Sequence, residues 1–161
     1  MLNTIRLFVR QPYSQQNNHT DISSIIHLLK KYNHYPLDIL PDSNISNKIS
    51  YKNDFTRNTQ IKFTPNNFRN YQIQNINNSN AMLVIRNNIS ESTAFELGYI
   101  NAKFNNFPIF FATNKDIEST HILDLYPNTI YQKFKDPEEI KDPLYKWLNQ
   151  VAHLYNVPPL N

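Results

Sequence analysis

The sequence predicts an α/β fold: one domain over residues 1–161, in which helices flank a doubly wound, mostly parallel sheet of about five strands. Strand-like and helix-like segments alternate along the chain, which favours parallel strands joined by helical crossovers. The inner strand candidates, AMLVI (81–85) and FPIFFA (107–112), are apolar throughout, as strands buried on both faces are. The expected architecture is therefore Rossmann- or flavodoxin-like.

The N-terminal third supplies two strand candidates and a helix. TIRLFVR (4–10) is short and rich in β-formers, and YPLDIL (35–40) is a plausible second strand. Between them, Thr20 or Asp21 can cap a helix. The apolar face of that helix recurs at helical spacing: Ile22, Ile25, Ile26 and Leu29.

Residues 41–66 are polar and rich in Asn and Ser, which predicts a long loop or an irregular insertion. The next segment, 67–78, has a weak helical pattern. Its candidate inward positions are Phe68, Tyr71, Ile73 and Ile76.

The C-terminal half continues the alternation. We expect a helix over 93–103, a short helix within 115–125 and a more exposed last strand over 128–134. Asp136-Pro137 starts a helix by cap and proline chemistry, and Asp142-Pro143 restarts it. One face of this last helix is apolar: Leu144, Trp147, Leu148, Val151 and Leu154.

The charge pattern gives little support to a nucleic-acid or membrane partner. The formal net charge is +3 and the pI about 9.0, but the chain has no Lys/Arg run and no RNA- or DNA-binding motif. This mild basicity suits a phosphorylated small molecule equally well. No apolar stretch approaches a membrane span and the N-terminus lacks the apolar region of a signal peptide, so we expect a cytoplasmic protein.

Residue counts exclude several kinds of chemistry. The chain has no cysteine, so disulfides and thiolate nucleophiles are excluded, and its five histidines show no metal-ligand spacing. Gly98 is the only glycine, which rules out the GxGxxG and Walker sequences. We therefore predict no metal and no cofactor, and we expect loops to turn at Asn, Asp and Pro.

The candidate binding site follows from the topology. In open parallel sheets, ligands bind outside the carboxyl ends of the strands, near the switch in strand order. The segments after 4–10 and after 81–85 meet at that edge. The expected ligand-binding residues are Arg10, Gln11, Tyr13, Asn88, Ser90, Ser92 and Thr93.

Glu96 has two interpretations at this edge. It completes a Thr93-x-x-Glu96 capping box, in which it would lie in the first helical turn and reach back to a backbone amide. Alternatively, it is a functional carboxylate that faces the crevice and attacks a sugar C1, or stabilises its positive charge, during cleavage of a glycosidic bond. Ser90, Ser92 and the first amides of the helix would then receive a phosphate.

STAFELGY (92–99), followed by Ala102 and a strand containing Pro108, resembles the signature of the nucleoside 2-deoxyribosyltransferase superfamily, which includes deoxynucleoside 5′-phosphate N-glycosidases. The resemblance is specific over about residues 80–112 and moderate over 4–40, where RQPYS (10–14) is similar to the first loop of relatives. It implies cleavage of, or transfer across, the N-glycosidic bond of a nucleoside or its 5′-monophosphate. It also implies a homodimer or a larger assembly.

The resemblance assigns roles to individual residues. Glu96 matches the nucleophile that forms a covalent sugar intermediate. Ser90 matches a serine of the phosphate-binding hydrolases, and Tyr13 matches an aromatic that lines the sugar or base pocket. Gly98 matches a glycine that we expect to allow close packing of helix on sheet.

The chain also departs from the resemblance. Relatives carry an acidic residue about two dozen positions before the nucleophile, but the corresponding window, 70–72, reads Asn-Tyr-Gln. Asp38, Asp54 and Glu91 are the candidate substitutes. Ser90 stands where transferases carry a carboxylate, which favours hydrolysis. Arg10 replaces the glycines of the first loop and would pair with a phosphate or obstruct the pocket.

Two further hypotheses remain open. Similar E-L-G-Y helices occur in TIR-like domains that bind or cleave NAD-type nucleotides, and the missing acid suits a domain that binds a nucleotide with little turnover. In the third reading the chain keeps only the fold, and Glu96 is a helix cap.

Overall fold

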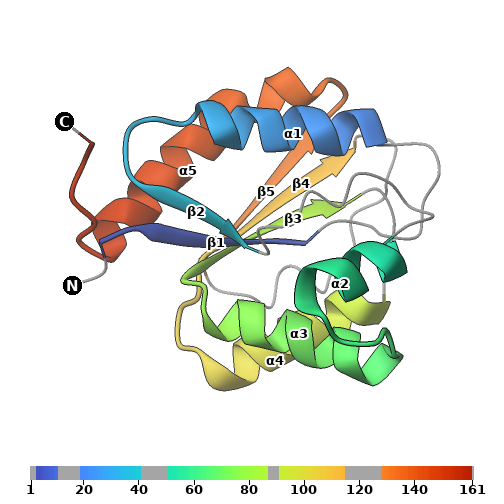
Figure 1. Ribbon diagram of the computed structural model, residues 1–161. Helices are drawn as coiled ribbons and strands as arrows, with labels where there is room; N and C mark the ends of the chain where they lie inside the picture. Colours follow the sequence, from blue (N-terminus) through green and yellow to red (C-terminus); the bar gives the residue numbers. More distant parts are fainter. Residues whose placement is uncertain (1–2, 11–18, 41–50, 87–90, 115–127, 161) are drawn as a thin grey trace.

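Five parallel strands form the centre of the part of the chain that the computed structural model describes, in the order β2-β1-β3-β4-β5 (Figure 1). This is the flavodoxin-like order, so the predicted α/β fold with a parallel sheet is confirmed. The described residues are 3–10, 19–40, 51–86, 91–114 and 128–160, with the backbone alone described for 19–21, 51, 54, 86, 91 and 92. The strands are β1 Ile5–Arg10, β2 Leu37–Leu40, β3 Ala81–Arg86, β4 Ile109–Asn114 and β5 Thr129–Phe134.

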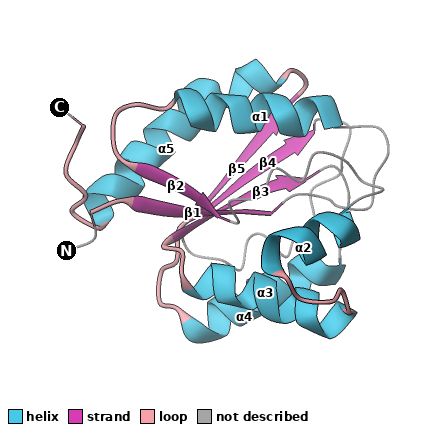
Figure 2. Ribbon diagram, in the orientation of Figure 1, coloured by secondary structure: helices cyan, strands magenta, loops and turns pink. Residues whose placement is uncertain are grey.

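Helices cover both faces of the sheet. Helices α1 and α5 lie on one face, and α2, α3 and α4 lie on the other (Figure 2). The helical segments are α1 His19–Lys31, α2 Tyr51–Thr59, α3 Pro65–Asn77, α4 Glu91–Lys103, the 3₁₀ turn η2 Pro137–Ile140 and α5 Lys141–Leu154. Among these described helices, none is long and apolar enough to cross a bilayer.

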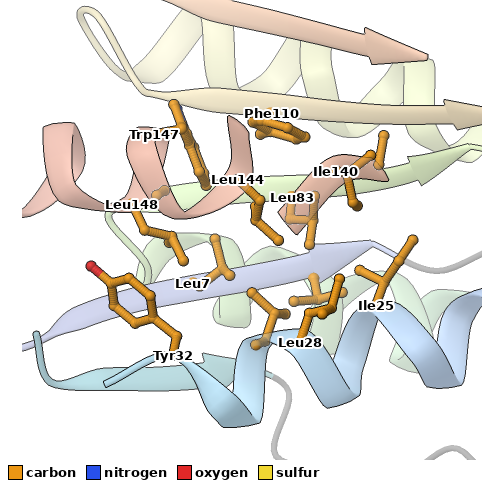
Figure 3. Close-up of a cluster of buried hydrophobic side chains, with 14 of the residues drawn as sticks. Leu7, Ile25, Leu28, Tyr32, Leu83, Phe110, Ile140, Leu144, Trp147 and Leu148 are labelled. Atoms are coloured by element: carbon orange, nitrogen blue, oxygen red, sulfur yellow. The ribbon is translucent and has the colours of Figure 1, made fainter. Parts of the chain in front are cut away.

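The side chains of the inner strands divide between two apolar clusters because alternate residues point to opposite faces. The α1–α5 face holds the larger cluster, in which Trp147 packs beside Phe110 at 5.4 Å between ring centroids (Figure 3). The opposite cluster joins α3 and α4 to the sheet. Its strand members include Phe8, Met82, Val84, Ile109 and Phe111.

The expected loop over 41–66 is wrong for its second half, because α2 lies within it and α3 starts at Pro65. The anchor is Phe55, which is 3% exposed although its helix is otherwise polar. Its ring lies 5.4–5.8 Å from those of Phe63, Phe68 and Tyr71. The predicted inward positions Phe68 and Tyr71 of α3 therefore contact α2, and residues 41–50 lie outside the described residues.

The C-terminal segments follow the prediction closely. Asp136 caps η2 by accepting a hydrogen bond from the Glu138 amide at 3.0 Å. Leu154, which we expected on the buried face of α5, is the last residue of the helix and is 55% exposed, whereas Ala152 is buried. The helix predicted over 115–125 lies outside the described residues.

Asparagine supplies the backbone conformations that glycine usually provides. Asn106, Asn128 and Asn156 have φ of 59°, 59° and 53°, in the left-handed region that asparagine tolerates better than most residues. Asn106 and Asn128 precede β4 and β5, and the Asn128 Nδ2 donates to the Asn106 carbonyl at 3.2 Å. The expectation that loops turn at asparagine is confirmed for these positions.

Gly98 does not serve close packing, so that expectation is wrong. It lies on the exposed face of α4, and a Cβ added there would meet no atom within 4 Å. Its φ is not positive. A glycine with these properties only weakens its helix, because it loses more backbone entropy on folding than alanine does.

Gly98→Ala should raise the free energy of unfolding by about 0.5–1 kcal/mol, since the backbone suits alanine and the space is open. Urea denaturation of the variant beside wild type measures the change. The matched control is Ala94→Gly, one turn earlier on the same exposed face, which should lower stability by a similar amount. A less stable Gly98→Ala variant would contradict this view of Gly98.

Candidate active site

The strand order locates the ligand edge between β1 and β3. Strand β2 lies on one side of β1 and β3 lies on the other. The connections that follow β1 and β3 therefore diverge between these two strands, which is where open parallel sheets bind ligands. Strand β1 ends at Arg10, and α4 begins at Glu91, five residues beyond the end of β3 at Arg86. The carboxyl end of β1 and the start of α4 therefore lie at the same edge (Figure 1).

Glu96 occupies a position on the buried face of α4. Its neighbour Leu97 and Ile100, one turn on, are buried in the apolar cluster against the sheet. Glu96 shares that burial and is 5% exposed. A carboxylate thus stands where helical periodicity calls for an apolar side chain, and burial without a partner would be costly.

Arg10 is that partner. Its Nε donates to Glu96 Oε2 at 2.7 Å, and the two side chains are 7% and 6% exposed. Arg10 faces α4 because Phe8, two residues earlier on β1, belongs to the α4-side cluster. Among the described residues, the other carboxylate oxygen, Oε1, accepts no hydrogen bond.

Burial and pairing act on Glu96 in opposite directions. Burial raises the pKa of the Glu96 carboxyl above its usual range, because the anion loses solvation. The Arg10 guanidinium lowers that pKa through its charge and its hydrogen bond, and so opposes the rise. Arg10 therefore favours the ionised carboxylate at a site where burial favours the neutral acid.

Helix α4 is tied to α3 at two levels. The Arg69 guanidinium lies over the Phe95 ring, 4.8 Å from its centroid. Two turns along, Tyr99 and Lys103 both donate to Asn77 Oδ1, at 2.8 and 2.7 Å. These contacts, with the packing of Leu97 and Ile100, fix the rotation of α4 that turns Glu96 toward Arg10.

The capping-box interpretation of Glu96 is wrong. Helix α4 begins at Glu91, so Thr93 is its third residue and Glu96 lies in the second turn. A capping box needs the threonine at the residue before the helix. Thr93 is half-buried within the helix, and the carboxylate of Glu96 bonds Arg10 instead.

Of the predicted site residues, the structure brings Arg10 and Glu96 together. Sequence reasoning placed Arg10 at the carboxyl edge of the sheet, where the structure has it. It predicted that Arg10 binds a phosphate or obstructs the pocket, and it did not predict the ion pair with Glu96. Arg10 lies two residues after Phe8 on β1, so the two side chains face the same side of the sheet. That alternation is the sequence signal that could have predicted the contact of Arg10 with α4. Thr93 is half-buried in the first turn of α4, and the remaining predicted residues lie outside the described side chains: Gln11, Tyr13, Asn88, Ser90 and Ser92.

Among the candidate acids, Asp38 does not join the site. It pairs in register with Arg6, four residues before Arg10, which is about 13 Å toward the amino end of the sheet. Both line a hollow of about 380 Å³ along β2, away from Glu96. The side chains of Asp54 and Glu91 are not described, and the described residues hold no group of three metal-binding side chains.

Two solved structures share this fold. The CMP N-glycosidase BcmB of Clostridium botulinum aligns with a TM-score of 0.61 over 88% of this chain and 98% of its own, at 12% identity. BlsM aligns with a TM-score of 0.61 over 98% of both chains, at 15% identity. The sequence matches no protein-family model and no curated protein. At these identities the likeness establishes a common fold, a single small α/β domain.

Separating the Arg10–Glu96 pair should destabilise the protein by about 3–5 kcal/mol, since either single change deprives a buried charge of this ion-pair partner. Arg10→Met and Glu96→Met should each show this loss in chemical denaturation. The double variant should lose clearly less than the sum, because it buries no charge.

Arg6→Met is the matched control for that cycle. Arg6 lies on the same face of β1 but is exposed, so its loss should change stability by no more than about 0.5 kcal/mol. Strictly additive losses in the cycle would show that the two side chains do not stabilise one another.

Proposed function

We propose that this protein cleaves the N-glycosidic bond of a nucleoside or nucleoside 5′-monophosphate, with Glu96 as the nucleophile and water as the acceptor. The observation that carries the proposal is a buried carboxylate, paired with Arg10, at the ligand edge of the sheet. Two further points support it. The fold is that of a structure described as a CMP N-glycosidase, and STAFELGY (92–99) resembles the nucleophile helix of such enzymes.

The first step forms a bond between the protein and the sugar. Glu96 Oε1 attacks C1′, the C1′–N bond breaks, and its electron pair leaves on the nitrogen of the base. Arg10 contributes by holding Oε2, which orients the carboxylate and favours its ionised form. The product of this step is a glycosyl ester of Glu96 and a free base.

The second step restores the carboxylate. Water attacks C1′, the ester C1′–Oε1 bond breaks, and the sugar leaves with a hydroxyl at C1′. The departing base gains one proton and the attacking water loses one, so the two steps balance. Hydrolysis is favoured over transfer because Ser90 stands where the transferases it resembles carry a carboxylate.

Turnover should be slow unless a carboxylate outside the described side chains assists the leaving base. The 70–72 window on α3 carries only amides and a phenol, and proton transfer to a leaving group typically contributes about 10²- to 10⁴-fold. Asp54 and Glu91 remain the candidates for that role.

The other substrate contacts in this proposal lie at the same carboxyl edge of the sheet. The free amides at the start of α4 suit a 5′-phosphate, because a helix N-terminus favours anions. The residues proposed to bind phosphate, sugar or base are Arg10, Gln11, Tyr13, Asn88, Ser90, Ser92 and Thr93. A homodimer or larger assembly remains part of the proposal.

Wild-type protein should release free base from at least one member of a panel of nucleosides, 5′-monophosphates and NAD, measured by chromatography. Glu96→Gln should lower that rate by at least about 10³-fold, because an amide cannot form the glycosyl ester. Glu138→Gln, the same change at an exposed position, is the control and should retain the wild-type rate.

Each result of the panel has a distinct meaning. Equal rates for wild type and Glu96→Gln would remove Glu96 from the chemistry. Release from NAD alone would replace the substrate class with a dinucleotide and favour the TIR-like alternative. No release from any compound would contradict the proposed hydrolysis.

A further inference from the structure

Thr113 carries a buried hydroxyl that has no hydrogen-bond partner among the described residues. The residue is fully buried, at 0% exposure, near the end of β4. Most buried hydroxyls in folded proteins are hydrogen-bonded, because leaving one unpaired costs free energy. An unpaired one at a ligand edge therefore calls for a reason.

The side chain of Thr113 lies on the face of the sheet that holds Glu96. Ile109 and Phe111, at alternate positions of β4, belong to the cluster formed with α4, so Thr113 points to the same side. Thr113 is also the second-last residue of its strand and lies at the carboxyl edge. Thr113 and Arg10 therefore lie on the same face of the sheet and at the same carboxyl edge.

The strand register sets the separation between Arg10 and Thr113. Arg10 is level with Val84 of β3, which is level with Phe111 of β4. Thr113 lies two residues further toward the carboxyl end, so its Cα is about 12 Å from that of Arg10. A nucleotide with C1′ at Glu96 can span this gap along the edge.

Two other hydroxyls on this face of the sheet differ from that of Thr113 in their position along the strands. Thr129 Oγ1 and Tyr131 Oη are also buried without a hydrogen-bond partner among the described residues, on the same face of the sheet. Thr129 pairs with Ile109 at the amino end of β4, and Tyr131 pairs with Phe111 in the middle. Of the three, Thr113 is the one at the ligand edge.

We infer that Thr113 is a substrate-binding residue whose hydroxyl bonds a sugar hydroxyl or a polar base atom of the bound nucleoside. This inference rests on the proposed function. A threonine hydroxyl both donates and accepts, so it can pair with either group. Because Thr113 is 0% exposed in the structure, this bond requires that substrate binding open the surface above the hydroxyl. The rival explanation is an interior hydroxyl that is satisfied by a trapped water or by nothing.

Thr113→Val separates these explanations, because it removes the hydroxyl and keeps the shape. The variant should be at least as stable as wild type in thermal melting, since an unpaired polar group is replaced by an apolar one. For base release its KM should rise about tenfold, the effect of losing one hydrogen bond to substrate, with kcat little changed.

Two variants complete the design. Thr113→Ser retains the hydroxyl and should retain the wild-type KM. Thr129→Val removes the matched buried hydroxyl at the amino end of the sheet. Its melting temperature should equal or exceed that of wild type, and its KM should be unchanged. A Thr113→Val variant with wild-type KM would overturn the inference and leave an interior hydroxyl.

Failure of the proposed function gives a different pattern. If wild type releases no base, the same nucleosides and 5′-monophosphates are tested for a shift in melting temperature. A shift that wild type and Thr113→Ser show and Thr113→Val lacks would support Thr113 as a binding residue while the hydrolysis proposal fails. No shift in any of these proteins would overturn both.

Discussion

The ion pair between Arg10 and Glu96 is the interaction on which the site depends. Two opposite charges are buried together, 86 residues apart in sequence, at the edge where open parallel sheets bind ligands. Such a pair contributes little to net stability compared with apolar side chains of similar size. Its value lies in what it holds: one carboxylate oxygen is engaged, and Arg10 opposes the rise in the pKa of Glu96 that burial causes.

The rest of the fold maintains the geometry of this pair. Two apolar clusters fix the sheet, and side-chain alternation along β1 turns Arg10 toward α4. Contacts from Arg69 and Asn77 on α3 hold α4 at Phe95, Tyr99 and Lys103, on either side of Glu96 along the helix. The packing of α4 on the sheet and its contacts with α3 therefore position Glu96 toward Arg10.

Sequence reasoning succeeded where local pattern and burial agree. Continuous apolar runs identified β3 and β4, and the alternation of elements gave the parallel sheet. It failed where a long-range contact decides. The Thr93–Glu96 spacing fits a capping box, but the helix begins earlier and the carboxylate bonds Arg10 of β1.

Helix α2 was missed because a single buried aromatic, Phe55, anchors an otherwise polar segment. Only the contacts of Phe55 with neighbouring rings reveal this role. The unpaired hydroxyl of Thr113 has no sequence signal at all.

The most direct test of this account is an NMR titration of the Glu96 carboxyl, with selectively labelled glutamate assigned by Glu96→Gln. In wild type, burial should place the pKa of Glu96 above that of an ordinary glutamate. In Arg10→Met the pKa should rise further, because the charge and hydrogen bond that oppose the rise are gone. A pKa that is unchanged or lower in Arg10→Met would contradict the claim that Arg10 lowers the pKa of this buried carboxyl.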